Sequence, residues 1–342
     1  MPEIERPPGG FPVVGVVGGG PLARMMYPAA VALGIRLRVL AGSTAESAAR
    51  VVPEPVLGDC RDAAVLAAFA QLSDVLTVAD AQVSVAALEK LEADGVVVRP
   101  SPAALAYVQD PSVAMRRRLT EFGEEVAGHE AGQGVARRRE LAALVARSPS
   151  GQGAAWPVAE RVRVAGTGDE VIAPAPGLDP ALAARATEVA LRIAGELGVV
   201  GVLAVELSEV VDPSTELDGT ASVVVDDLAM RPHDAGRWTV DGAVTSQFEQ
   251  HLRAVLDLPL GDPRPRAPWS VTVDVLGCDY PDLYRSYLHV MAHDPGVKVH
   301  LYGKDVSPGT VVGHVTVCGE DLDDVRARAR HAADFIAGVI DK

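Results

Sequence analysis

Apolar runs and helical patterns alternate through the first third of the chain. Residues 12–20 (PVVGVVGGG) form a β-branched run that ends in glycines, and residues 21–34 carry apolar side chains at helical spacing. A second run, IRLRVLAG, is followed by a helix expected from about Ala45, and a third run, DVLTVAD, follows a further helix. Strands that alternate with helices predict an α/β domain with a doubly wound parallel sheet.

The middle of the chain predicts an α+β arrangement. Residues 139–164 (RELAALVARSPSGQGAAWPVAERVRV) contain two strand-like runs around a turn-forming SPSGQG segment. Residues 181–198 then have the apolar spacing of a long helix that ends at Gly198.

Two apolar runs after this helix carry acidic residues. GVLAVELSEV contains Glu206, and SVVVDDLAM contains Asp226 and Asp227. If the two runs are antiparallel neighbours, their carboxylates can share one divalent cation. A Pro-rich segment at residues 262–270 then leads into a β-rich module that ends in a helix. We therefore predict three domains, over residues 11–108, 109–262 and 263–342.

The composition excludes several classes of partner. The net charge of −15 disfavours nucleic acid and anionic membranes, because both require a basic surface. No apolar run reaches 18 residues, and the N-terminal segment lacks the basic start of a signal peptide, so we expect a cytoplasmic protein. The three cysteines lie far apart without metal-type spacing, which indicates reduced thiols.

The glycine turn after the first strand is a weak phosphate-binding signal. Gly18, Gly20 and Ala23 have the spacing of a fingerprint in which backbone amides at a helix N-terminus approach a phosphate. The same glycines also allow close packing of a strand on a helix. No acidic residue follows the second strand to bind a ribose, which argues against a nicotinamide-dependent dehydrogenase.

The densest group of polar residues lies between residues 223 and 250. It combines adjacent aspartates with an Arg-Pro-His triplet, a further acid and base, and a Trp-Thr pair. Buried charge is costly unless it is paired or bound to a metal, so a strand followed by such a loop predicts a functional site. The alternative is a solvated loop with structural ion pairs.

Several segments resemble N5-carboxyaminoimidazole ribonucleotide synthases, which are ATP-grasp ligases of purine biosynthesis. VVGVVGGGPLARMM is similar to that family's GGGQLGRM opening, and LAMRPHDAGRWTVDGAVTSQFEQHLRAV is similar to its IAPRPHNSGHWTIDACVTSQFEQHLRAV. HLYGKDVSPGTVVGH extends the resemblance toward the C-terminus, so that it covers most of the chain. The resemblance implies an ATP-grasp-like fold, and a ligase that forms carboxyphosphate from ATP with magnesium and then carboxylates 5-aminoimidazole ribonucleotide.

The resemblance also assigns residues. It implies a metal pair at Glu206 and Asp227, a substrate pocket near Arg231, His233 and Lys304, and a homodimer.

The sequence departs from this family at the nucleotide site. A connector at residues 123–134 stands where the family has a lid subdomain that clamps ATP, and none of the four lysines lies between residues 91 and 297. Phosphoryl transfer depends on cations placed around the phosphates. Ser307, Thr310 and Val311 also replace basic residues of the family's C-terminal motif. We therefore predict a truncated central ATP-grasp domain that no longer uses ATP or the ribonucleotide.

Our main hypothesis is an ATP-independent enzyme that performs acid-base chemistry on another small molecule, by cyclisation, elimination, or transfer or loss of a carbamate. We expect no cofactor, with magnesium as the remaining candidate. The alternatives are a non-catalytic scaffold dimer and a working synthase with an abbreviated nucleotide site. Acidic neighbours are expected to raise the pKa of His233. The predicted catalytic residues are His233, Asp227, Asp234 and Glu206, and the predicted substrate-binding residues are Arg231, Lys304, Gly19, Gly20, Trp238, Thr239 and Gln247.

Overall fold

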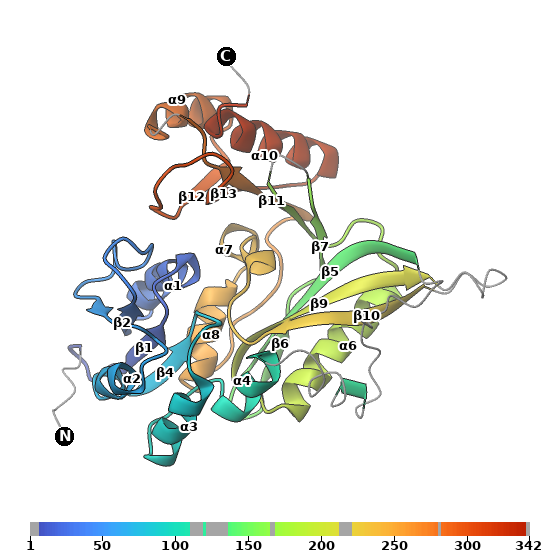
Figure 1. Cartoon of the computed structure of the whole chain (residues 1–342). Coiled ribbons are helices and arrows are strands. Elements are labelled where there is room, and N and C mark those ends of the chain that lie inside the picture. The colour runs from blue at the N-terminus through green and yellow to red at the C-terminus, as the bar shows by residue number, and fades with distance from the viewer. Residues whose placement is uncertain are drawn as a thin grey trace.

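The N-terminal part of the computed structural model is a four-stranded parallel sheet flanked by helices (Figure 1). The structure describes residues 7–109, 119–120, 136–164, 168–211, 221–279 and 282–339, and the connector at 123–134 lies outside them. The sheet order is β3-β2-β1-β4. Its elements are β1 (Val13–Val17), α1 (Pro21–Ala32), β2 (Arg36–Ala41), β3 (Val56–Leu57), α2 (Ala63–Ala70), β4 (Val75–Val78), α3 (Val85–Ala93) and α4 (Pro102–Gln109).

The helix expected from about Ala45 is replaced by turns. The backbone amide of Ala48 donates to the carbonyl of Gly19 at 2.7 Å instead of to an acceptor within its own segment. The segment is thereby tied to the glycine turn, and prolines at positions 53 and 55 prevent a longer helix.

A nine-stranded sheet forms the rest of the fold, in the order β10-β9-β5-β7-β8-β11-β13-β12, with β6 paired to β5. It continues through the predicted central and C-terminal domains, because β8 pairs with β11. The strands are β5 (Ala136–Arg147), β6 (Gly153–Ala155), β7 (Ala159–Val162), β8 (Glu170–Ala173), β9 (Gly201–Val211), β10 (Ala221–Ala229), β11 (Trp269–Leu276), β12 (Lys298–Leu301) and β13 (Val311–Gly319). The helices are α6 (Pro180–Glu196), η2 (Asp234–Gly236), α7 (Thr239–Gly242), α8 (Gln247–Val255), α9 (Tyr284–His293) and α10 (Leu322–Ile336).

The hairpin expected over residues 139–164 contains three strands rather than two. The break between β6 and β7 falls at Pro157, which has no amide hydrogen to continue a ladder. The neighbouring Trp156 is buried, and its indole nitrogen donates to the carbonyl of Thr245 at 3.1 Å. This contact ties the sheet to the polar segment.

Helix α8 joins the two sheets. Its Phe248 and Leu252 pack with Val14 and Met26 of the N-terminal part, while the helix also contacts β5 and β9 of the large sheet. The polar loop that precedes α7, together with α7 itself, consequently lies where the three parts of the molecule meet (Figure 1).

Glu170 on β8 is buried at the join between the large sheet and α10. It is 1% exposed, and its carboxylate accepts hydrogen bonds from Arg326 at 2.9 Å and from Arg330 at 2.7 Å. None of the described helices has both the length and the apolar character that a membrane span requires.

Candidate active site

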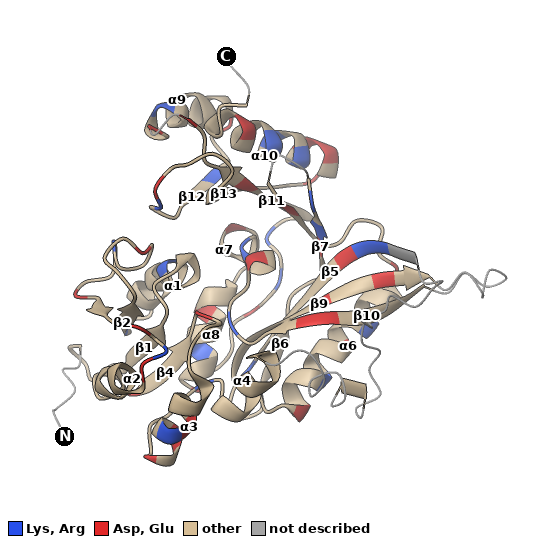
Figure 2. Ribbon diagram, in the orientation of Figure 1, with Lys and Arg blue, Asp and Glu red and all other residues tan. Residues whose placement is uncertain are grey.

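A β-bulge in β10 brings acidic side chains to one face of the large sheet. Figure 2 shows acidic segments on both β9 and β10. Asp227 and Glu206 are register partners, and the register shifts between Val225 and Asp227, which leaves Asp226 as the extra residue. A bulge interrupts the alternation of side chains between the two faces. Asp227 therefore lies on the same face of the sheet as Glu206. Asp226 accepts a 2.5 Å hydrogen bond from the hydroxyl of Ser208.

Glu206 lies between a histidine and an arginine from other segments. Its Oε1 is 3.3 Å from Nε2 of His233 and 3.5 Å from Nη1 of Arg161. Burial raises the pKa of the Glu206 carboxyl, the Arg161 guanidinium opposes that rise, and the Asp227 carboxylate adds to it. A divalent cation would relieve the repulsion between the two carboxylates, and carboxylate oxygens are the ligands that Mg²⁺ prefers. The pair therefore fits a magnesium ion.

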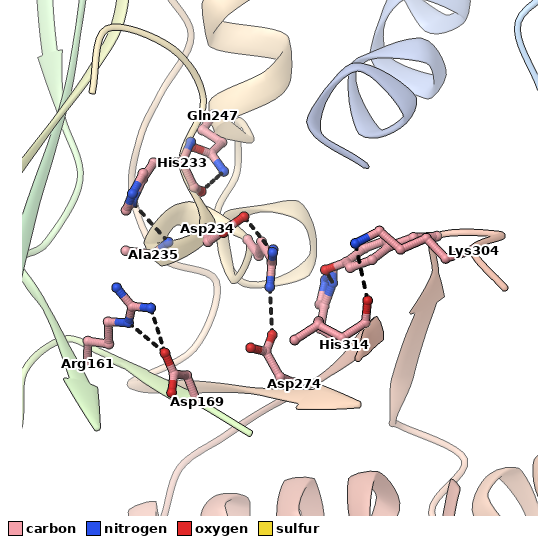
Figure 3. Close-up of polar contacts among 12 residues, drawn as sticks. Arg161, Asp169, His233, Asp234, Ala235, Gln247, Asp274, Lys304 and His314 are labelled. Atoms are coloured by element: carbon pink, nitrogen blue, oxygen red, sulfur yellow. Dashed lines mark hydrogen bonds and ion pairs between the residues drawn. The ribbon is translucent and has the colours of Figure 1, made fainter. Parts of the chain in front are cut away.

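Arg161 is a site residue that our sequence analysis did not identify. Its Nε and Nη2 both contact Oδ2 of Asp169, at 3.0 and 2.5 Å, while Nη1 faces Glu206. The signal in the sequence is the alternating Arg-Val-Arg of residues 161–163, at the end of β7. Figure 3 shows Arg161 on the same side of the site as His233.

His233 is a neutral histidine whose side chain is 15% exposed, and our prediction of a raised pKa is wrong. Burial lowers its pKa to about 4, and the charge of Asp234 only partly opposes that effect. The amide of Ala235 donates to Nδ1 at 3.3 Å, so the neutral ring carries its proton on Nε2 and donates it toward Glu206. This geometry suits a residue that orients Glu206.

The loop around His233 is fixed by a buried glutamine. The side chain of Gln247 accepts from the His233 amide at 2.9 Å and donates to the His233 carbonyl at 2.7 Å. The amide of Gln247 donates to the Thr239 hydroxyl at 2.9 Å. Trp238 is 1% exposed and lies in the apolar core beneath the loop. Thr239, Gln247 and Trp238, which we predicted to bind substrate, therefore have contacts that position the loop.

Arg237 connects the loop to the C-terminal part of the sheet. It is 7% exposed, and its guanidinium contacts Asp274 of β11 at 2.6 Å and Asp234 at 2.5 Å. Asp234, a predicted catalytic residue, is therefore the partner of an arginine three positions away. The Arg237 guanidinium also lies 5.2 Å from the ring centroid of Tyr302. Asp274 and Tyr302 are residues to which our sequence analysis gave no role.

The glycine turn and Lys304 meet on the other side of the site. The hydroxyl of Ser47 donates to the carbonyl of Tyr302 at 2.5 Å, which brings the loop of Lys304 next to the segment that is tied to Gly19. Gly20 caps the N-terminus of α1, and a Cβ at Gly19 would collide with the carboxylate of Glu46. Lys304 is exposed, and its Nζ donates to the carbonyl of Val311 at 3.3 Å (Figure 3).

A cavity of about 140 Å³ opens between the acidic strands and the N-terminal sheet. Its lining includes Asp80, Asp227, Arg231 and His233. The predicted residues Asp227, Arg231 and His233 thus share one cavity, whereas Glu206 lines a neighbouring recess and Lys304, Gly19 and Gly20 line neither.

Two other histidines, both buried, hold the site in place and make stability sensitive to pH. The Val202 amide donates to Nδ1 of His251 at 3.1 Å, and Nε2 lies 2.7 Å from the hydroxyl of Thr77. Nδ1 of His314 lies 2.7 Å from the hydroxyl of Tyr302, and its ring stacks on that of His300. Burial lowers the pKa of His251 to about 3 and lowers the pKa of His314 well below its usual value.

We predict that the free energy of unfolding falls as the pH is lowered from 7 to 5. Both folded-state pKa values lie below the unfolded value of about 6.5, so the unfolded chain binds more protons below that pH and becomes favoured. Together with His233, whose pKa is also lowered, three such groups give a limiting slope of ~4.1 kcal/mol per pH unit, and Glu206 and Asp274, whose pKa values burial raises, reduce it toward pH 5. Urea unfolding at several pH values measures this slope. His251→Asn should reduce the slope by the contribution of about one proton. A stability that is constant or rises on acidification would contradict the prediction.

Three family models together match nearly the whole chain. An ATP-grasp domain matches residues 106–248, a ribonucleotide synthetase preATP-grasp domain matches residues 12–109, and a phosphoribosylaminoimidazole carboxylase C-terminal domain matches residues 270–328. The ATP-grasp fold with a parallel N-terminal sheet, which we predicted, is thereby confirmed.

Several similar proteins are named as N5-carboxyaminoimidazole ribonucleotide synthases or synthetases. The N5-carboxyaminoimidazole ribonucleotide synthase of Mycobacterium tuberculosis (strain ATCC 25618 / H37Rv) is 44% identical, over 95% of this chain and 88% of its own. That of Corynebacterium ammoniagenes is 40% identical, over 98% and 94%. Among solved structures, the N5-carboxyaminoimidazole ribonucleotide synthetase from Thermus thermophilus is 28% identical with a TM-score of 0.80, covering 96% of this chain and 99% of that one. An ADP complex of such a synthetase is 25% identical with a TM-score of 0.83, covering 97% and 98%.

These relatives correct our main functional hypothesis. Their names and the ADP complex contradict an ATP-independent enzyme without a nucleotide, and they favour the alternative of a working synthase. The count of lysines misled us, because arginines supply the cations near the acidic pair. Arg161 lies in β7, and Arg163 is the residue after that strand. Identity of 44% over 95% of the chain shows that the protein belongs to the N5-carboxyaminoimidazole ribonucleotide synthase family.

Proposed function

We propose that this chain is an ATP-dependent ligase that carboxylates the amine of 5-aminoimidazole ribonucleotide with bicarbonate. The observation that carries the proposal is the identity of 44% with the Mycobacterium tuberculosis synthase over nearly the full length of both chains. The geometry of the acidic pair supports the same activity, because phosphoryl transfer is catalysed mainly by cations positioned around the phosphates.

Glu206 and Asp227 would hold a magnesium ion that neutralises developing charge on the phosphates of ATP. His233 donates a hydrogen bond toward Glu206 and keeps that carboxylate in place. Arg161 and Arg163 line a recess of about 100 Å³ beside Glu206 and Asp226. They offer the positive charge that lysines would otherwise supply, and arginine binds phosphate oxygens in a bidentate manner.

The ribonucleotide would bind on the side of the N-terminal sheet. Arg231 lines the cavity that also contains Asp227 and His233, so a substrate there lies next to Asp227 of the magnesium pair. Near the glycine turn, Arg24 donates to the carbonyl of Ser47 at 3.1 Å and faces Gly303, beside Lys304. Arg24 and Lys304 are two cations suited to the substrate's phosphate.

We further propose that the ATP-clamping lid is shortened. The alignment with the Mycobacterium tuberculosis synthase has 386 positions, whereas 95% of 342 residues is about 325, so about 61 positions of the relative have no counterpart in this chain. A smaller lid shields less of the triphosphate from water, so we expect weak ATP binding with the chemistry retained.

The proposal predicts product formation that requires all three substrates. The purified protein is incubated with 5-aminoimidazole ribonucleotide, bicarbonate and ATP–Mg²⁺, and ADP, phosphate and the carboxylated nucleotide are measured. We expect all three products, with half-saturation at roughly millimolar ATP because of the short lid. Omission of the ribonucleotide should abolish the carboxylated product. Failure of calorimetry to detect ATP–Mg²⁺ binding at millimolar concentration, together with no product, would eliminate the proposal.

We also propose a homodimer, which the family resemblance implies. Light scattering should then give twice the chain mass of 35.6 kDa, and a monomer mass at micromolar concentration would reject it.

A further inference from the structure

Three of the eight histidines gather between α9 and α10, in the C-terminal part of the fold and away from the acidic pair. His289 and His293 are four residues apart on α9, which places them on one face of that helix, and His331 faces them from α10. Their ligand atoms all lie within 4.8 Å of one another. Within the described ranges, this is the one group of three metal-ligating side chains that close together.

The spacing of the rings matches what a small transition metal requires. Nε2 of His289 and Nε2 of His331 are 3.2 Å apart. Ligand nitrogens at 2.0–2.1 Å from a tetrahedral zinc ion lie about 3.3 Å from each other. The third ring, His293, is exposed and lies 4.6 Å from His331 between centroids, so a rotation of its side chain completes the set.

The surroundings hold the ring of His289 in orientation. The ring of His289 stacks on Phe335 with centroids 3.7 Å apart and planes 11° from parallel. The planes of His289 and His293 are within 6° of each other. A stacked ring loses little rotational freedom when it binds a metal, which favours binding.

The ligand set determines the class of metal. Three imidazoles favour Zn²⁺ and its neighbours Ni²⁺ and Cu²⁺, whereas Mg²⁺ prefers oxygen ligands and retains its waters. The acidic pair at Glu206 and Asp227 has the opposite preference. The two sites would therefore bind different metals from the same solution.

A metal at this position would anchor a poorly buried helix. Val290 is the fully buried residue of α9, while Tyr284 and Leu288 are 79% and 82% exposed. Burial of apolar surface is the main force that docks a helix, so α9 is held weakly by its own side chains. We propose that His289, His293 and His331 form a zinc site that fastens α9 to α10, with a fourth ligand position open to water.

The test is a titration of the full-length protein, freed of metal by chelator dialysis and carrying no histidine tag. Zn²⁺ is added in calorimetry with Mg²⁺ in excess, so that the acidic pair is already occupied. We expect one Zn²⁺ per chain, and at least an about tenfold loss of affinity in His293→Ala and in His331→Ala. Arg285→Ala is the matched control, because Arg285 is exposed on the same helix and pairs with Asp282. It should bind Zn²⁺ as the unaltered chain does.

Two further readouts keep the result interpretable. Zn²⁺ should raise the melting temperature of the unaltered chain and of Arg285→Ala, but not that of His293→Ala, which removes an exposed side chain and is expected to fold. Co²⁺ in place of Zn²⁺ should give the visible absorption of a tetrahedral site, lost in the same variant. The proposal is overturned if the unaltered chain binds no Zn²⁺, or if both histidine variants bind it as tightly as the unaltered chain does.

Discussion

Glu206→Gln should lower ATP-dependent carboxylation by about a hundredfold to a thousandfold, because it removes a charged ligand of the proposed magnesium ion. The amide has nearly the same shape as the carboxylate but no negative charge. It also removes a desolvated carboxylate whose pKa is raised by burial and by Asp227. The fold should therefore tolerate the change, and a loss of activity would not reflect unfolding.

The measurement is the rate of product formation at saturating substrates, with the melting temperature recorded in parallel. Glu188→Gln on α6 is the matched control, because the Glu188 side chain is 63% exposed and forms only surface ion pairs. It should keep full activity. A Glu206→Gln protein with more than about a tenth of the normal rate would show that Glu206 does not hold the catalytic metal.

Arg237→Met should lower the free energy of unfolding by about 3–5 kcal/mol. The guanidinium lies between Asp234 and Asp274, and its loss leaves the Asp274 carboxylate, which is 14% exposed, without its partner. Methionine retains much of the length and apolar volume, so the change mainly reports the lost charge. Urea unfolding monitored by tryptophan fluorescence gives the value.

A double variant separates charge from packing in this prediction. Arg237→Met with Asp274→Asn should recover part of the loss, because the unpaired carboxylate is then neutral. Arg264→Met breaks a 2.6 Å pair with Asp262 in which the arginine side chain is 79% exposed, and it should cost less than about 1 kcal/mol. An Arg237→Met loss as small as that of Arg264→Met would refute the role that we assign to Arg237.

The pairing of Glu206 with Asp227 is the part of the site that the sequence predicted well. Two apolar runs that carry acids, separated by a loop, are sufficient to indicate neighbouring strands. The bulge at Asp226, which sets Asp227 on the face of Glu206, could not be predicted, because it depends on the register of β10 against β9.

The partners of the loop could not be predicted for a related reason. Asp274 and Tyr302 lie 37 and 65 positions beyond Arg237, and only the tertiary fold brings them to it. The pKa of His233 was mispredicted because acidic neighbours are visible in a sequence while burial is not, and burial is the larger effect. The nucleotide site was misjudged in the same way, since lysines were counted but Arg161 and Arg163 were not placed in space.

β8 and β11 pair although they lie on opposite sides of the predicted domain boundary at residue 262. During synthesis on the ribosome, β8 is therefore complete long before β11 exists. β8 ends at residue 173 and β11 begins at residue 269, so the edge of β8 that pairs with β11 emerges unpaired. Unpaired edges recruit other chains, and a charge on the strand discourages this. Glu170 supplies that charge until Arg326 and Arg330 are synthesised. We therefore expect the Glu170 carboxylate, which is buried in the folded protein, to reduce pairing of β8 with other chains while the nascent chain is still incomplete.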